Sequence, residues 1–166
     1  DFIVKPLKLP VQRGVEAFDG EVYRTVRGNK TPTIVEDEKL VHSMRRRLWA
    51  VASILLTPLS ELFVKLTTDD EYSFSATNTK LDDAATIELH KDYKINYVRV
   101  KCLNPDTEKE QKYILNVSED LVTINELLLP AKISVSWDDA PAFEVEPIGA
   151  ESNPQIPEAV FRIEEG

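Results

Sequence analysis

The sequence is poor in residues that cross-link chains or bind metals. Its 166 residues include one cysteine, Cys102, and two histidines, His42 and His90. A single cysteine allows no disulfide within the sequence, whereas small secreted domains usually depend on disulfides. We therefore expect an intracellular or virion-associated protein, or part of a larger assembly, rather than a secreted disulfide-bonded one.

Motifs for common catalytic chemistry are missing as well. The five glycines are scattered, so no glycine-rich loop is available to bind phosphates. The nucleophile motif GxSxG and the zinc motif HExxH do not occur. We therefore expect a protein that is not an enzyme and has no cofactor, no metal and no catalytic residue.

Long hydrophobic runs are also lacking. The best candidate for a membrane span, Leu48 to Leu59, has 12 residues, whereas a spanning helix needs about 20. We interpret it as the buried end of a helix and expect no membrane span. No signal peptide is visible, and the first residue is Asp1 rather than Met, so we expect that the chain was processed or trimmed.

Charge is unevenly distributed around a net value of −9. Residues 1–50 carry ten basic and seven acidic residues, a net +3, whereas residues 51–166 carry ten and twenty-two, a net −12. This polarity suits head-to-tail contacts between copies or a basic partner, although chance scatter explains it equally well. The overall acidity makes nucleic acid an improbable partner.

One long amphipathic helix is predicted after residue 32. Thr33 and Glu36 have the spacing of a capping box, and Pro58 should end the helix. Apolar residues at steps of three and four predict a single buried face, made of Leu40, Val41, Met44, Leu48, Val51, Ala52 and Leu55.

Alternating apolar and polar residues predict strands before and after the helix. Residues 20–27, 62–76, 86–90, 93–103, 113–117 and 133–146 have this pattern. The apolar set changes face between Tyr97 and Val98, which indicates a bulge or burial on both faces. Residues 120–129 fit a helix or a strand equally well. The sequence thus predicts an α+β fold, with a mostly antiparallel sheet, sandwich or barrel-like, and one long helix packed on it.

A single domain over residues 1–166 is expected, with a core at 20–146 and an extended arm at each end. The segments 1–19 and 147–166 contain prolines between apolar residues, which favours arms or edge strands. Phe2, Ile3, Val160 and Phe161 are the arm residues that we expect to dock on a neighbouring subunit.

The remaining polar candidates have simpler interpretations. His42 follows Glu38 by four residues, so helix-surface pairing is expected rather than a metal site. Cys102 is expected to be a buried thiol. The acidic pairs 69–70, 82–83 and 138–139 fall in predicted loops, where turn formation explains them.

The basic run Arg45, Arg46 and Arg47 is the main candidate for a charged contact. We expect a solvated helix face, with phosphates or an acidic neighbouring subunit as alternative partners. The core is expected to include Leu48, Val51, Leu55, Val98, Val100, Leu115, Val135 and Trp137.

The absence of catalytic motifs, the arms and the charge polarity together predict a structural or assembly protein that contacts other protein subunits. A virion component, such as a phage head or tail protein, fits this style of fold. The alternatives are a module that binds carbohydrate or peptide, and a hydrolase with a carboxylate site that follows no motif.

Overall fold

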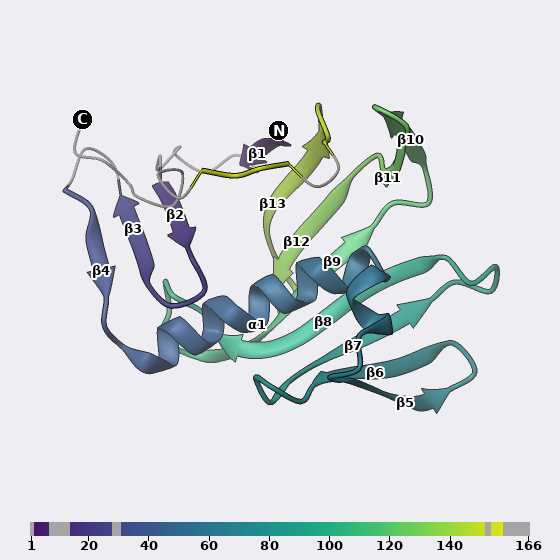
Figure 1. Ribbon diagram of the computed structural model, residues 1–166, viewed down its shortest axis with the longest axis horizontal. Coiled ribbons are helices and arrows are strands. Elements are labelled where there is room, and N and C mark those ends of the chain that lie inside the picture. Colours follow the sequence, from purple (N-terminus) through teal and green to yellow (C-terminus); the bar gives the residue numbers. More distant parts are fainter. Residues whose placement is uncertain (1, 7–13, 28–30, 152–153, 158–166) are drawn as a thin grey trace.

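The computed structural model describes residues 2–6, 14–27, 31–151 and 154–157. The described part is an α+β fold, as the sequence predicts: one helix packs on a mainly antiparallel sheet (Figure 1). The strand order of the main sheet is β1-β13-β12-β9-β8-β7-β6-β5. Since this order is linear, the sheet is open, with β5 and β1 at its edges.

The main sheet is built mostly from hairpins between consecutive strands, with β12 added next to β9 and β1 next to β13. Its strands are β1 (Phe2–Pro6), β5 (Val64–Asp70), β6 (Ser73–Asn78), β7 (Asp83–Leu89), β8 (Ile95–Leu103), β9 (Glu110–Val117), β12 (Ile133–Trp137) and β13 (Ala140–Pro147). The hairpins predicted around residues 70, 91–92, 104–106 and 138–139 are confirmed. Segments that alternate apolar and polar residues, separated by turn residues, form antiparallel hairpins of this kind.

The predicted irregularity in β8 is a β-bulge. Glu88 pairs with Tyr97 and Leu89 pairs with Ile95, so Asn96 is the extra residue. The bulge lies just before the predicted change of face. It lets Ile95 before it and Val98 after it both point into the core.

The helix α1 (Glu38–Ile54) is shorter than predicted and begins later. Asp37, not Thr33, is its N-cap, and the Asp37 carboxylate accepts a hydrogen bond from the Lys39 amide. Thr33 instead lies in the strand β4 (Thr33–Val35), so the predicted capping box is wrong. A short 3₁₀ helix, η1 (Thr57–Ser60), follows α1 and contains Pro58.

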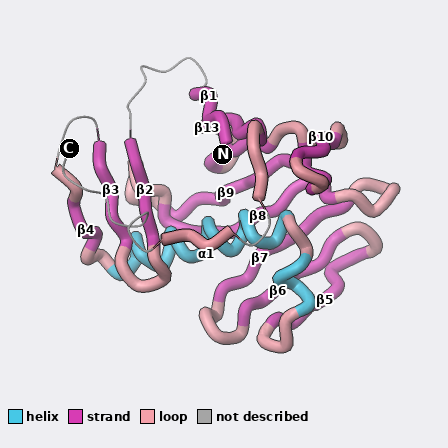
Figure 2. The backbone as a smooth tube through the Cα atoms, turned by 45° about the horizontal axis from the view of Figure 1, so that its top comes forward, coloured by secondary structure: helices cyan, strands magenta, loops and turns pink. Residues whose placement is uncertain are grey.

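Two smaller sheets complete the fold. β2 (Gly14–Phe18), β3 (Tyr23–Arg27) and β4 form one of them, which stands at the end where α1 begins (Figure 2). β10 (Leu121–Ile124) and β11 (Leu127–Pro130) form a hairpin, which resolves the ambiguous segment 120–129 as strands. Asn125 and Glu126 both have positive φ in the turn between them, as a type I′ hairpin turn requires.

The expected N-terminal arm pairs partly within its own chain. β1 is antiparallel to β13, with Phe2 opposite Pro147 and Ile3 opposite Glu146, and β2 pairs with β3. Val160 and Phe161 lie outside the described residues.

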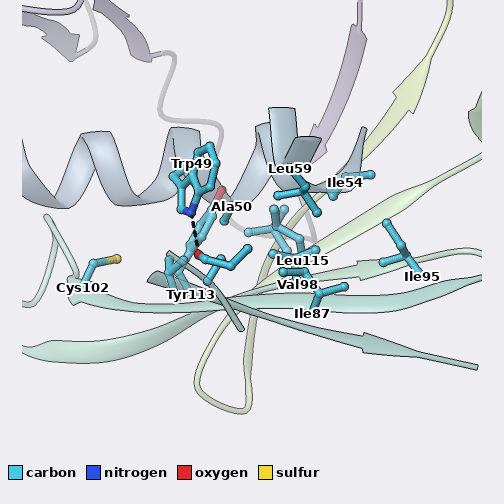
Figure 3. Packing of buried hydrophobic residues seen from close by; sticks show 14 residues of the cluster. Trp49, Ala50, Ile54, Leu59, Ile87, Ile95, Val98, Cys102, Tyr113 and Leu115 are labelled. Carbon is cyan, nitrogen blue, oxygen red and sulfur yellow. Dashed lines mark hydrogen bonds between the residues drawn. The ribbon is translucent and has the colours of Figure 1, made fainter. Parts of the chain in front are cut away.

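The main core lies between α1 and one face of the sheet. Trp49 and Ala50 from the helix face Val98, Tyr113 and other residues of the central strands (Figure 3). The Trp49 indole Nε1 donates a hydrogen bond to the Ala76 carbonyl oxygen at 3.1 Å. The predicted burial of Val98, Val100, Leu115 and Val135 is confirmed, and Trp137 is partly buried against the same core.

The predicted helix face is wrong in its second half. Leu48, Val51 and Leu55 are 45%, 46% and 59% exposed. The face of α1 that packs on the sheets contains its buried residues, which are Ser43, Met44, Trp49, Ala50, Ser53 and Ile54. Serine and alanine let the helix lie close to the sheet, because they add little bulk between the two backbones.

Candidate functional site

A buried carboxylate gathers the polar residues of α1. The Asp83 side chain, at the start of β7, is fully buried. Its Oδ1 lies 2.6 Å from His42 Nε2 and accepts a hydrogen bond from Arg46 Nε at 3.0 Å. Arg45 Nε lies 3.9 Å from Oδ2. The expectation that Asp83 lies in a loop and serves a turn is therefore wrong, and so is the expected pairing of His42 on the helix surface.

Three further contacts of the basic run hold α1 to neighbouring strands. Arg46 also donates to the Lys101 carbonyl oxygen at 2.9 Å. Arg47 donates to a Glu16 carboxylate oxygen at 3.1 Å and to the Tyr23 hydroxyl at 3.4 Å. The Glu16 carboxylate stabilises the charged Arg47 against the cost of burial, so the pKa of Arg47 is raised although burial alone lowers it.

The basic run is thus not a plain solvated helix face. Arg46 and Arg47 join α1 to the main sheet and to the small sheet, because hydrogen bonds from a charged guanidinium are strong and directional. A contact of Arg45, Arg46 and Arg47 with another molecule stays a prediction.

A hollow of about 250 Å³ lies beside this cluster. His42, Ser43 and Cys102 lie on its wall. Nothing in the sequence places His42 near Cys102, since most of α1, the strands β5, β6 and β7, and most of β8 lie between them in the chain. However, the His42 Nε2 faces Asp83, and the Ser43 hydroxyl donates to the Leu103 carbonyl oxygen at 2.5 Å.

The thiol in this hollow is buried, as expected. Burial raises the pKa of Cys102, so the thiol is held in its protonated, poorly nucleophilic form. This arrangement gives no support to nucleophilic catalysis by Cys102.

The other acidic pairs differ from each other: Asp69 and Asp70 end β5, so their expected place in a loop is wrong, whereas Asp138 and Asp139 form the turn between β12 and β13. Asp138 accepts hydrogen bonds from the Lys112 amide at 2.9 Å and from the Gln111 side chain at 3.0 Å. These donors, the Lys112 amide first, lower the pKa of Asp138. Asp70 accepts from the Tyr72 amide. No group of three or more potential metal ligands occurs among the residues that the structure describes.

One side of α1 exposes apolar side chains. Leu48, Val51 and Leu55, which we call the apolar ridge, are spaced by three and four residues along the helix. This is the spacing of the a and d positions at a helix–helix contact. Leu56, which follows α1 with a positive φ of 59°, is 47% exposed.

A hollow runs beside the apolar ridge. It has a volume of about 390 Å³. Its lining is mostly apolar and includes one charged residue, Arg45. The lining residues are Phe18, Gly20, Arg45, Leu48, Trp49, Ala52 and Leu81. We call this hollow the apolar groove. Since Leu48 belongs to both features, the ridge and the groove form one continuous surface.

Comparison with known protein families, with curated proteins and with solved structures finds no match to this chain. The candidate site therefore stands on its geometry alone. Within the described residues, no helix has the length and apolar character needed to cross a membrane.

Proposed function

We propose that this protein is a non-enzymatic assembly subunit that binds a second copy of itself through the apolar ridge and the apolar groove. One observation carries the proposal: Leu48, Val51 and Leu55 are about half exposed along one line of the helix. Contiguous apolar surface on a soluble fold is costly in water and commonly marks a protein contact.

The shape of this surface favours a second copy as the partner. A ridge that adjoins a groove is self-complementary, because two copies related by a twofold axis can each insert a ridge into the other's groove. Isologous contacts of this kind are the commonest in homo-oligomers.

The charge pattern agrees with self-association. Residues 48–60 contain no charged side chain, so an antiparallel pair of helices centred on Val51 brings no like charges together. The heptad-like spacing supports side-chain interdigitation along the same line.

The setting expected from the sequence remains part of the proposal. The charge polarity between residues 1–50 and 51–166 supports additional contacts with other subunits, and a virion component such as a phage head or tail protein is one such assembly. That setting, and an intracellular or virion-associated location, are inferred from sequence and fold style alone.

The decisive experiment is the solution mass by light scattering over a range of protein and salt concentrations. We expect a multiple of 18.8 kDa that persists at high salt, because the contact is apolar. The Val51→Glu variant should be a monomer that unfolds as cooperatively as the wild type. A wild-type monomer under every condition would overturn the proposal.

A matched control places the same charge elsewhere. Leu128 in β11 is 64% exposed and lies in the β10–β11 hairpin, away from α1 (Figure 1). Leu128→Glu should leave the assembly intact. If Leu128→Glu dissociates the assembly as well as Val51→Glu does, a general effect of added negative charge explains the result instead. An assembly that dissociates with added salt would indicate contacts driven by charge polarity.

A further inference from the structure

The face of the main sheet opposite α1 is uncovered by any described element (Figure 1). Along β8 and β9, the buried Val98, Val100, Tyr113 and Leu115 face the helix. Alternate residues of a strand point to opposite faces. The residues between them therefore form the outer face, which is polar and charged.

A depression of about 600 Å³ lies on this outer face. β8 contributes Tyr97 and Arg99, and β9 contributes Lys112, Ile114 and Asn116. The turn at Asp138 and Asp139 closes one end. An adjoining hollow of about 340 Å³ shares Arg99 and Lys112, so these two cations stand between the two hollows.

The two cations are close neighbours in the sheet. Arg99 pairs with Ile114 and Lys101 pairs with Lys112, so Lys112 is the diagonal neighbour of Arg99. Long side chains at diagonal positions of neighbouring strands are close enough to contact the same group. Arg99 and Lys112 can therefore contact one acidic group together.

Neither cation is neutralised by an ion pair in the described structure. Lys101, on the same face, lies 2.7 Å from Glu110. No carboxylate oxygen of the described residues forms an ion pair with Arg99 or Lys112. Asp138, on the same lining, interacts electrostatically with Lys112 but lies outside ion-pair distance of it. Arg99 and Lys112 together therefore provide a local site for an anion on a chain with net charge −9.

A second layer of contacts orients Arg99. Its guanidinium carbon lies 5.9 Å from the centre of the Tyr97 ring, within the range of a cation–π contact. The Tyr97 hydroxyl donates to Glu88, which also accepts from the Asn96 side chain at 3.3 Å. Arg99 thus rests on a ring that is itself fixed.

The opposite wall offers groups of a different kind. The Asn116 amide can donate and accept hydrogen bonds, and the Asp139 carboxylate can accept them. Asp138 contributes less, because both of its oxygens already accept hydrogen bonds from Lys112 and Gln111. The site therefore combines an anion-binding end with an end that suits hydroxyl groups.

We propose that this depression binds an acidic saccharide. Its carboxylate contacts Arg99 and Lys112, and its hydroxyl groups contact Asn116 and Asp139. An extended peptide is disfavoured, because β8 and β9 are internal strands whose backbone groups are engaged in the sheet. Recognition here depends on side chains, and a shallow polar surface with an aromatic ring suits a sugar.

The test uses an oligogalacturonate as the acidic probe and a malto-oligosaccharide of equal length as the neutral one. Binding is followed by calorimetry and by NMR shifts of the β8 and β9 amides. We expect the acidic probe to bind and the neutral probe not to bind. The double variant Arg99→Gln, Lys112→Gln should weaken binding at least about tenfold, as loss of charge-assisted hydrogen bonds implies.

Lys65→Gln is the matched control. Lys65 lies in β5, on the same outer face, since its partner Thr77 is adjacent to the buried Ala76. This variant should bind the acidic probe as the wild type does. Inorganic phosphate is tested as a competitor, and weak competition is expected because it lacks the hydroxyl pattern of a sugar.

Three results would overturn the proposal. The first is the absence of binding by the acidic probe. The second is an equal loss of affinity in Lys65→Gln and in the double variant, which indicates diffuse attraction to charge. The third is full displacement by phosphate at equal concentration, which indicates an unspecific anion site.

Discussion

His42 Nε2 and Asp83 Oδ1 lie 2.6 Å apart, although 41 residues separate them in the chain. This contact joins a partly exposed side chain of α1 to a fully buried carboxylate at the start of β7. With Arg46 on the same oxygen and Arg45 at 3.9 Å from the other, the carboxylate joins the helix to the sheet. A buried charge of this kind is maintained only because its partners are present.

Removing the carboxylate should destabilise the fold strongly. We expect Asp83→Ala to lower the free energy of unfolding by about 3–5 kcal/mol, the usual cost of breaking a buried ion pair. Chemical denaturation measures this loss. Asp82→Asn is the control, because Asp82 is exposed and asparagine tolerates its positive φ of 54°. A loss below about 1 kcal/mol in Asp83→Ala would place the cluster among weak surface pairs.

One type of substitution, leucine to alanine, distinguishes a core residue that the sequence predicted correctly from one that it predicted wrongly. Leu115 is 2% exposed and Leu48 is 45% exposed. Leu115→Ala should cost about 2–5 kcal/mol because it leaves a cavity in the core. Leu48→Ala should cost about 0.5 kcal/mol or less, measured at a protein concentration where the chain is monomeric. Equal losses in the two variants would contradict the assignment of Leu48 to the surface.

The turn of the β10–β11 hairpin offers a stabilising substitution. Glu126 has a φ of 67°, a conformation that costs an L-residue roughly 1–2 kcal/mol and that glycine adopts freely. Glycine also has more conformational entropy in the unfolded chain, which offsets part of this gain. Glu126→Gly should therefore stabilise the protein by up to about 1 kcal/mol, in keeping with the preference of type I′ turns for Asn-Gly. A rise in Tm by calorimetry checks this.

The control for this turn is Glu119→Gly. Glu119 is exposed and is not among the residues with positive φ, so glycine there should be neutral or slightly destabilising. Stabilisation by Glu119→Gly as well would show that the conformation of Glu126 is not the cause.

Alkaline pH should destabilise the fold through two buried tyrosines. Burial raises the pKa of Tyr113 to about 12, and burial together with the Glu16 carboxylate raises the pKa of Tyr23 to about 12, from an ordinary 10.0. Between these values the unfolded chain has released protons that the folded chain retains. The contribution to stability is therefore complete below pH 10 and is lost as the pH rises towards 12.

Tyrosinate absorbance and unfolding, followed together, test this behaviour. Part of the tyrosine signal should titrate late, or should appear together with cooperative unfolding. Tyr113→Phe should reduce the loss of stability between pH 10 and 12. An unchanged pH dependence in this variant would show that Tyr113 ionises without any link to folding.

The strands and the fold class could be predicted from the sequence because their signal is local. Residues 133–146 alternate apolar and polar side chains around Asp138 and Asp139, and that pattern alone requires a hairpin with one buried face. The change of face near Tyr97 likewise indicated a bulge or burial on both faces, and the pairing of Glu88 with Tyr97 and of Leu89 with Ile95 shows the bulge.

Other local patterns were compatible with more than one structure. Thr33 and Glu36 have the spacing of a cap, but Thr33 pairs with Thr25 in the small sheet, so the helix starts at Asp37 instead. Residues 120–129 fit a helix as well as a strand until the turn at Asn125 and Glu126 is known. In both cases pairing with distant or neighbouring strands decided the outcome.

The candidate surface was missed for a related reason. The helix has two usable faces, and hydrophobicity favours the one with Leu48, Val51 and Leu55. The structure packs the other face, where Ser43, Ala50 and Ser53 allow a close approach and Trp49 bonds to Ala76. These small residues, spaced by seven and three along the helix, marked the face that packs closely, but a hydrophobicity pattern does not detect small residues.

The sequence by itself determined the sheet, its hairpins and the presence of one amphipathic helix, because burial on one face imposes a local period. Only the tertiary structure decided which face of α1 is buried, that Asp83 is an internal charge, and that Arg99 and Lys112 share one hollow. Each of these depends on which distant segments meet, and packing over the whole sheet fixes that.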